Sequence, residues 1–99
     1  MTINKTKNGA DLTIALEGRL DTMTAPDLEA ELKKSLDGVE TLSLDFSKLD
    51  YISSAGLRVL LSAHKLMSAK GGMKVTNVNE IVQEVFEVTG FADILNIVK

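Results

Sequence analysis

The sequence contains no cysteine and no tryptophan, and it has only one proline, one tyrosine and one histidine in 99 residues. Without cysteine the chain cannot form a disulfide, ligate an iron–sulfur cluster or use a thiol nucleophile. Because aromatic residues make up 4% of the chain, its core must be built from Leu, Ile and Val. No apolar run reaches the roughly 18 residues of a membrane-spanning helix, so no membrane association is expected. The chain also lacks the basic and hydrophobic opening of a signal peptide, and we therefore expect a cytoplasmic protein.

Charge and length exclude further classes of protein. Acidic side chains outnumber basic ones by 14 to 11, which gives a formal net charge of −3. A protein that binds nucleic acid directly is expected to carry a basic surface, which this balance does not provide. The 44% hydrophobic and 25% charged content is typical of a globular domain. Since there is no repeat or long linker, we predict a single domain over residues 1–99.

Several short segments alternate apolar and polar residues, which is the period of half-buried strands. Residues 2–7 and 12–16 flank Asn8-Gly9, a tight-turn signal that predicts a hairpin at the start of the chain. Further strands are expected at residues 42–46, 73–78 and 94–98.

Three segments have helical spacing, and a glycine marks the end of each: residues 24–38, 54–71 and 79–90. In the first, Thr24 and Asp27 have the spacing of a capping box, while Met23 and Leu28 have that of a hydrophobic staple. Asn79 is the N-cap expected for the third helix.

The order β-β-α-β-α-β-α-β predicts an α/β fold. Strands separated by single helices imply right-handed crossovers and a mostly parallel central sheet of about five strands. The N-terminal hairpin would form one edge of that sheet, and the helices would pack on it. Such sheets carry functional groups in loops beyond the carboxyl ends of strands. The two loops that qualify cover residues 19–25 and 47–56.

Residues suited to catalysis are few. His64 lies within the second predicted helix among apolar residues, where packing beside the core is expected rather than a role as catalytic base. Asp21, Asp45 and Asp50 fall near the two loops, but aspartates at strand ends and turns commonly make local hydrogen bonds. The sequence shows neither metal-ligand spacing nor a phosphate-binding glycine loop. We therefore expect a protein that is not an enzyme and that binds no cofactor or metal. The alternative is a small enzyme that uses these carboxylates.

Residues 45–57, DFSKLDYISSAGL, combine a strand, a bend, two hydroxyls and a helix start. Ser53 or Ser54 can cap the helix there, a role worth about 1 kcal/mol. Gly56 lies early in the helix, where glycine is less stable than alanine. Its presence predicts either a close approach to the backbone or a turn that needs the conformational freedom of glycine.

This segment resembles the signature of STAS domains, in particular the bacterial anti-sigma-factor antagonists, in which a strand leads into Asp-Ser-Ser/Thr-Gly-Leu. Residues 18–21 (GRLD), the pair Gly71-Gly72 and residues 86–91 (FEVTGF) are similar to other recurring segments of that family. Together these segments cover nearly the whole chain in the order of the family. Two positions depart from the motif, because Ser53 replaces its acidic residue and Ala55 replaces its second Ser/Thr.

The resemblance implies a STAS-like fold and a protein that binds an anti-sigma factor, itself a serine kinase, and so frees a sigma factor for transcription. It also implies that the kinase blocks binding by phosphorylating the first serine after the acidic position, which is Ser54 here, until a PP2C-type phosphatase removes the group. Ser53 is the alternative target. The expected partner-binding residues are Asp21, Thr22, Ser53, Ser54, Gly56, Leu57 and Arg58.

Two questions stay open from the sequence. A STAS-type adaptor subunit of a transporter, lipid-trafficking or sensory complex would share the fold without a phospho-switch, and the missing acidic residue before Ser54 is consistent with one. In addition, apolar residues cover more than half the circumference of the second predicted helix, whereas packing on a sheet needs a stripe of only about 100°. Either neighbouring helices cover the excess, or it forms an apolar patch beside Arg58 that contacts a partner.

Overall fold

A hairpin opens the chain and forms one edge of a five-stranded sheet in the computed structural model, which describes residues 1–98. The first two strands pair antiparallel, and every later pair is parallel. The predicted α/β architecture, with an edge hairpin and a mostly parallel sheet, is therefore confirmed. The strands lie in chain order across the sheet: β1 (Thr2–Asn8), β2 (Asp11–Leu20), β3 (Thr41–Ile52), β4 (Met73–Thr76) and β5 (Ile97–Val98).

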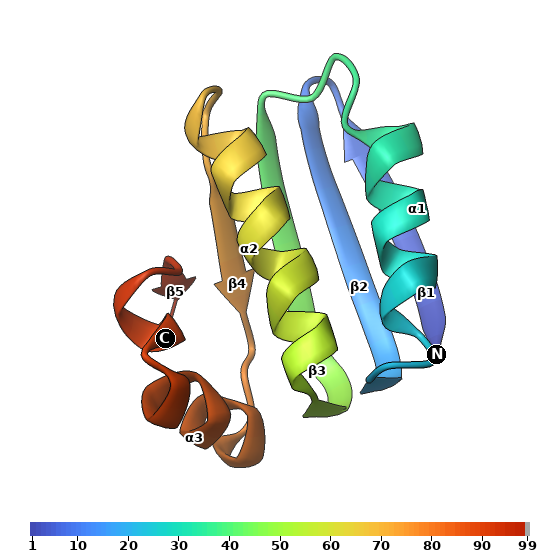
Figure 1. Ribbon diagram of the computed structural model, residues 1–99. Helices are drawn as coiled ribbons and strands as arrows, with labels where there is room; N and C mark the ends of the chain where they lie inside the picture. Colours follow the sequence, from blue (N-terminus) through green and yellow to red (C-terminus); the bar gives the residue numbers. More distant parts are fainter. Residues whose placement is uncertain (99) are drawn as a thin grey trace.

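Three helices connect the parallel strands: α1 (Ala25–Ser35), α2 (Ser54–Ser68) and α3 (Glu80–Thr89). Helices α1 and α2 lie side by side across one face of the sheet, while α3 lies near the carboxyl end of β4 (Figure 1). The side chain of Asn79 accepts a hydrogen bond from the backbone N–H of Val82 at 2.8 Å, which confirms the predicted N-cap of α3. Gly90 ends this helix with a left-handed φ of 82°.

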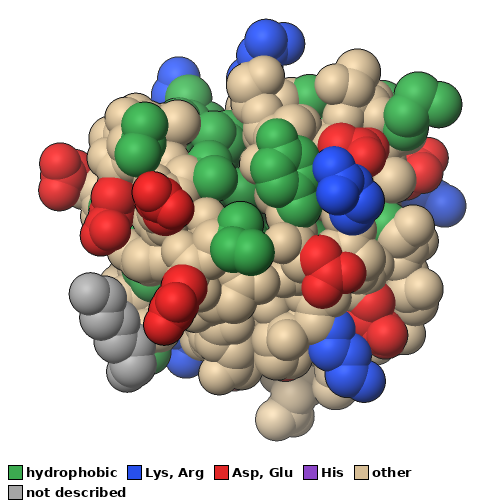
Figure 2. All heavy atoms as spheres, turned by 90° about the horizontal axis from the view of Figure 1, so that it is seen from below, with side chains coloured by type: hydrophobic (Ala, Val, Ile, Leu, Met, Phe, Trp, Pro, Cys, Tyr) green, Lys and Arg blue, Asp and Glu red, His purple; other side chains and the backbone are tan. Residues whose placement is uncertain are grey.

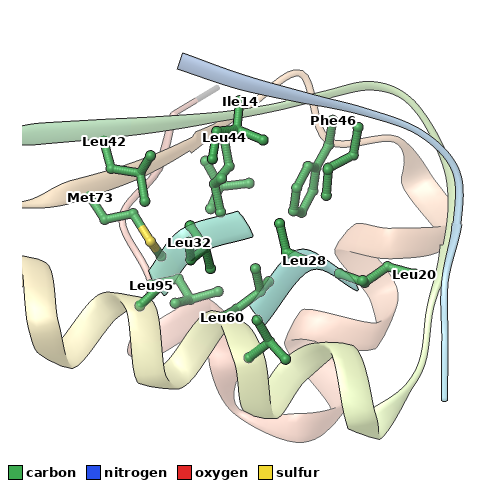
Figure 3. Close-up of a cluster of buried hydrophobic side chains, with 14 of the residues drawn as sticks. Ile14, Leu20, Leu28, Leu32, Leu42, Leu44, Phe46, Leu60, Met73 and Leu95 are labelled. Carbon is green, nitrogen blue, oxygen red and sulfur yellow. The ribbon is translucent and has the colours of Figure 1, made fainter. Parts of the chain in front are cut away.

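Aliphatic side chains fill the space between the sheet and the helices (Figure 3). Alternate residues of β3 point into this core, so that Leu42, Leu44 and Phe46 are each at most 1% exposed. Leu28 enters the core from α1. Phe86 joins α3 to the same core, because its ring lies 6.4 Å from the ring of Phe46. The two phenyl groups therefore fix α3 to the sheet.

The strand expected over residues 42–46 continues to Ile52 as the long strand β3. Its alternation changes phase because β3 contains one extra residue relative to β2 at each of two register shifts. Such bulges change which residues face the core: after the first shift Leu49 is buried although it is out of phase with Leu42, Leu44 and Phe46, and the second shift restores the original phase at Ile52, which is also buried. The loop predicted over residues 47–56 is therefore wrong in its extent, since Ser53 alone separates β3 from α2.

Strands β4 and β5 are shorter than predicted. Asn77 has a left-handed φ of 58°, which ends β4 after Thr76. A short 3₁₀ helix, Phe91–Asp93, follows α3, and residues 94–96 form a turn before β5, which therefore has only two residues.

The start of α1 also differs from the predicted capping box. Thr24 occupies the N-cap position, but its side chain makes no capping hydrogen bond. Its Oγ1 instead accepts from the backbone N–H of Asp21 at 2.9 Å and donates to the carbonyl oxygen of Arg19 at 2.8 Å. Met23 is 83% exposed, so the predicted hydrophobic staple to Leu28 does not form. Polar side chains thus stabilise the loop between β2 and α1.

Candidate functional site

The carboxyl ends of β2 and β3 meet the first turn of α2 at the end of the sheet where the parallel strands finish (Figure 1). We call this end of the sheet the edge from here on. Leu20 and Ile52, the last residues of the two strands, lie opposite each other in the register. The backbone N–H of Ser53 then donates to the carbonyl oxygen of Leu20 at 2.9 Å. The carbonyl oxygen of Ser53 accepts the first helical bond from the N–H of Leu57 at 3.0 Å. Ser54 therefore begins a helix directly at this edge.

The two adjacent serines place their hydroxyls in different environments. Ser54 is an exposed residue at the start of α2. The Oγ atom of Ser53 is buried and has no hydrogen-bond partner in the described part of the chain. Ser53 occupies the N-cap position, but neither it nor another side chain caps the helix there. The capping role considered for Ser53 is therefore not realised.

Gly56 is required for the close packing of this helix start. A Cβ atom at Gly56 would lie 2.7 Å from Cγ of Leu20 and 2.9 Å from Cγ1 of Ile52. Its φ is not positive, so a special backbone conformation is not the reason for glycine here. The close approach predicted for Gly56 is confirmed, and the groups that approach it belong to the ends of β2 and β3.

We expect Gly56→Ala to lower the free energy of unfolding by about 1–3 kcal/mol, because the added methyl group overlaps two buried side chains. For a domain of this size the thermal midpoint should fall by about 4–8 °C for each kcal/mol lost. Differential scanning calorimetry measures both quantities. Ser62→Ala, at an exposed position of the same helix, is the control and should change the stability by less than about 0.5 kcal/mol. Equal stability of the Gly56 and Ser62 variants would contradict this packing argument.

Asp21 lies in the loop after β2, at the edge that contains Ser54. Its Oδ1 accepts hydrogen bonds from the backbone N–H groups of Met23 at 3.0 Å and Thr24 at 3.2 Å. Nε of Arg19 lies 3.7 Å from its Oδ2. Partial desolvation raises the pKa of Asp21, but these hydrogen bonds and the Arg19 charge oppose it, and the pKa is lowered from its usual value. The carboxylate is therefore kept ionised in a defined orientation.

Arg19 and Tyr51 form a further part of this edge that sequence reasoning missed. The two residues lie opposite each other on β2 and β3. Cζ of Arg19 is 4.6 Å from the centroid of the Tyr51 ring, which is a cation–π contact. Alternation could have shown that Arg19 points away from the core, but the bulges in β3 concealed its pairing with Tyr51. The ring and the Asp21 carboxylate together orient the guanidinium group.

The other candidate catalytic carboxylates are Asp45, which makes local hydrogen bonds, and Asp50. Oδ1 of Asp45 accepts from the Asn77 side chain and from the N–H of Ser47, each at 3.0 Å. These hydrogen bonds lower the pKa of Asp45, although desolvation acts in the opposite direction. Asp50 is exposed. A general acid needs a raised pKa, which Asp21 and Asp45 lack, and residues 1–98 contain no group of three His, Asp or Glu residues that could hold a metal ion.

The remaining predicted site residues divide into surface and core. Thr22 and Arg58 are exposed, whereas Leu57 is 4% exposed and packs in the core. The prediction that Leu57 contacts a partner therefore needs correction, because little of its surface is accessible. Most of the apolar excess of α2 is covered within the fold, and Leu66, at 59%, is the large apolar residue of this helix that stays widely exposed. His64 is half-buried, as expected for a residue beside the core.

Comparison with known protein families shows which family has this fold and site. The family model described as "Mlab, STAS domain" matches residues 3–98, which is nearly the whole described chain. The chain belongs to the STAS domain family. The resemblance seen in residues 45–57 and in the segments around them is thereby confirmed. In this STAS domain, the signature segment is the one that carries Ser54 to the start of α2.

Curated relatives of this STAS domain are named anti-sigma factor antagonists. A protein of Bordetella bronchiseptica named "Putative anti-sigma factor antagonist BtrV" is 44% identical over 85 residues, which cover 84% of this chain and 73% of that protein. The anti-sigma-B factor antagonist of Bacillus subtilis is 28% identical over 92 residues, which cover 92% of this chain and 84% of the relative.

Two solved structures share the fold at lower identity. The anti-sigma factor antagonist SpoIIAA in its unphosphorylated form has a TM-score of 0.76 and 18% identity, and the match covers 99% of this STAS domain and 88% of SpoIIAA. The phosphorylated form of SpoIIAA from Bacillus matches with a TM-score of 0.75 at 19% identity, covering 99% of this chain and 92% of that one.

Within residues 1–98, the helices are too short or too polar to cross a lipid bilayer.

Proposed function

We propose that this STAS domain is a cytoplasmic anti-sigma factor antagonist that binds an anti-sigma factor and thereby frees a sigma factor for transcription. The names of the curated relatives support this assignment. In the proposal, the anti-sigma factor is also a serine kinase, and phosphorylation of Ser54 ends binding until a PP2C-type phosphatase reverses it. The observation that carries the proposal is the exposed Ser54 at the first position of α2. That SpoIIAA occurs in an unphosphorylated and a phosphorylated form is consistent with such a switch.

Accessibility favours Ser54 over Ser53 as the phosphate acceptor. A kinase must bring the γ-phosphorus of ATP within bonding distance of the serine oxygen, and the Oγ of Ser53 is buried. In the transfer, Oγ of Ser54 bonds to the γ-phosphorus, the bond from this phosphorus to the β–γ bridging oxygen breaks, and ADP leaves. A base of the kinase takes the hydroxyl proton. The phosphatase later hydrolyses the phosphoserine: the oxygen of a water molecule bonds to phosphorus, the bond from phosphorus to Oγ breaks, and inorganic phosphate and the serine hydroxyl are released.

A phosphate at Ser54 would change the surface of the domain without unfolding it. Phosphorylation adds a charge of about −1.5 to −2 at neutral pH. The positive end of the α2 dipole stabilises that charge, and Arg58 lies one helical turn further along the exposed surface. For a partner, however, the same group adds bulk and charge at an edge that already carries the ionised Asp21. The proposed switch therefore acts through a local change of charge and not through a change of fold.

The contact surface in this proposal consists of the exposed and half-buried groups at the edge. Asp21, Thr22, Ser54 and Arg58 contact the partner directly, and the Arg19–Tyr51 pair described above extends the same surface. Gly56 and Leu57 lie beneath it and hold α2 against the strands.

Incubation of the protein with candidate anti-sigma kinases and radiolabelled ATP tests the proposal. We expect one phosphate per chain with a cognate kinase, transfer to Ser53→Ala at the wild-type level, and no transfer to Ser54→Ala. Labelling of Ser54→Ala but not of Ser53→Ala would move the switch to Ser53. The absence of both phosphate transfer and complex formation with any such kinase would favour the STAS-type adaptor without a phospho-switch.

A further inference from the structure

The acidic charge of the chain is concentrated near its C-terminal end. Residues 76–98 contain four acidic side chains and no basic one. The remaining residues contain ten acidic and eleven basic side chains, so the net negative charge arises from this single segment. Three of the four acidic residues belong to α3.

Helix α3 arranges its residues in parallel rows. The apolar row and the acidic row follow the same i, i+4, i+7 spacing, and each apolar residue comes directly after an acidic one, so the two rows lie about 100° apart around the helix. We call the two rows together the α3 surface. Its members are Ile81, Val85 and Val88 in the apolar row and Glu80, Glu84 and Glu87 in the acidic row.

Helix α3 has more apolar residues than it uses for packing against the core. Val82 and Phe86 attach α3 to the core and are fully buried. Ile81 is 60% exposed and Val88 is 79% exposed, while Val85 between them is partly buried. Large apolar side chains that line up on one helix face without being covered are typical of interaction surfaces. The fold therefore leaves the apolar row of α3 largely accessible to a partner.

A hollow of about 470 Å³ runs along the acidic row. It is lined by all three glutamates of α3 and by Ile97 and Val98 of β5. Figure 2 shows the end of the molecule that contains the carboxyl ends of the strands, with acidic side chains grouped at the left, over α3, and hydrophobic side chains next to them. Within residues 1–98, none of these three glutamates takes part in an ion pair.

The start of α3 is attached to β3 near the C-terminal end of that strand. The Nδ2 group of Asn79, directly before α3, donates to the carbonyl oxygen of Leu49 in β3 at 2.8 Å. Leu49 lies three residues before the end of β3, so the first turn of α3 is held near the strand end from which α2 begins. A partner that covers Ser54 is therefore near the first turn of α3, where Glu80 begins the acidic row.

We infer that the α3 surface docks the anti-sigma factor through a segment of that partner with apolar side chains at its centre and Lys or Arg at its rim. This inference rests on the proposed function and adds the chemistry of the partner. Charge complementarity selects this occupant, because three carboxylates on one stripe attract a basic rim and repel an acidic one. A symmetric dimer through α3 would place two such acidic rows against each other and is disfavoured for that reason.

Two double variants test the α3 surface against the anti-sigma kinase that phosphorylates Ser54, with binding measured by biolayer interferometry. Glu84→Lys/Glu87→Lys should weaken the complex at least tenfold and remove most of the salt dependence of the association rate. Ile81→Ala/Val88→Ala should weaken it about tenfold, mainly through faster dissociation. Neither pair should lower the thermal midpoint by more than a few degrees, because the replaced side chains are exposed.

The chain offers matched controls for both variants. Asp37→Lys/Glu40→Lys makes the same change in net charge at two exposed positions before β3, at the opposite end of the sheet. Leu66→Ala truncates an exposed apolar residue of α2. Wild-type affinity of both α3 variants would overturn this inference alone, and so would an equal loss in the charge-matched control. Failure of the wild-type protein to bind any anti-sigma kinase would overturn the proposed function, and this inference with it.

Discussion

Ser54→Asp is expected to weaken binding to the anti-sigma factor at least tenfold while leaving the thermal midpoint nearly unchanged. A tenfold loss requires only about 1.4 kcal/mol of binding free energy, which a desolvated carboxylate in an interface can readily remove. The fold should tolerate the substitution, because a negative charge at the first position of α2 interacts favourably with the helix dipole. Isothermal titration calorimetry measures the affinity, and differential scanning calorimetry measures the stability.

Ser62→Asp is the control for this comparison, because it places the same charge at an exposed position in the middle of α2. We expect its affinity to stay within a factor of about two of the wild-type value. Tight binding by Ser54→Asp would remove the charge-based switch from the proposal. A large loss of stability in that variant would instead show that Ser54 chiefly maintains the start of the helix.

Phe86→Ala is expected to cause the largest loss of stability among the variants considered. The side chain is fully buried against Phe46, and truncation of a buried Phe to Ala costs about 3–5 kcal/mol. Domains of this size have a total stability of about 5–15 kcal/mol, so the thermal midpoint should fall by more than about 10 °C. Urea unfolding followed by circular dichroism measures the loss of free energy, and a thermal melt followed by the same signal measures the midpoint.

Val88→Ala lies on the same helix and provides the matched control. Because Val88 is 79% exposed, its truncation should change the free energy of unfolding by less than about 0.5 kcal/mol. A Phe86 variant that is as stable as the Val88 variant would mean that α3 is attached to the sheet by other contacts.

The order of strands and helices was predictable because the period of two and the helical spacing both report burial on one face. The hairpin and the N-cap Asn79 were recognised from turn and cap chemistry, which acts over a few residues, although the turn lies at Gly9-Ala10, one residue after the predicted Asn8-Gly9. The full length of β3 was not predictable. Its two bulges depend on pairing with β2, a contact between segments far apart in the sequence. The capping box at Thr24 failed for a related reason, since the hydroxyl is used by the loop backbone.

The candidate site was located by its motif rather than by its detailed contacts. The motif placed Ser54 at the start of a helix and Asp21 at the same edge, as the structure has them. It could not show that the adjacent hydroxyl of Ser53 is buried, because this depends on side-chain orientation at the junction of β3 and α2. The Arg19–Tyr51 contact requires knowledge of the strand register.

The antiparallel pairing of β1 with β2 has a practical consequence for experiments. Thr2 pairs with Glu17, near the carboxyl end of β2, so the N-terminus lies at the end of the sheet that contains Asp21. An affinity tag or fluorescent protein fused to Met1 would compete for space with an incoming partner. The Gly9-Ala10 turn lies at the far end of the hairpin, and a label inserted there would leave the approach to Ser54 unobstructed.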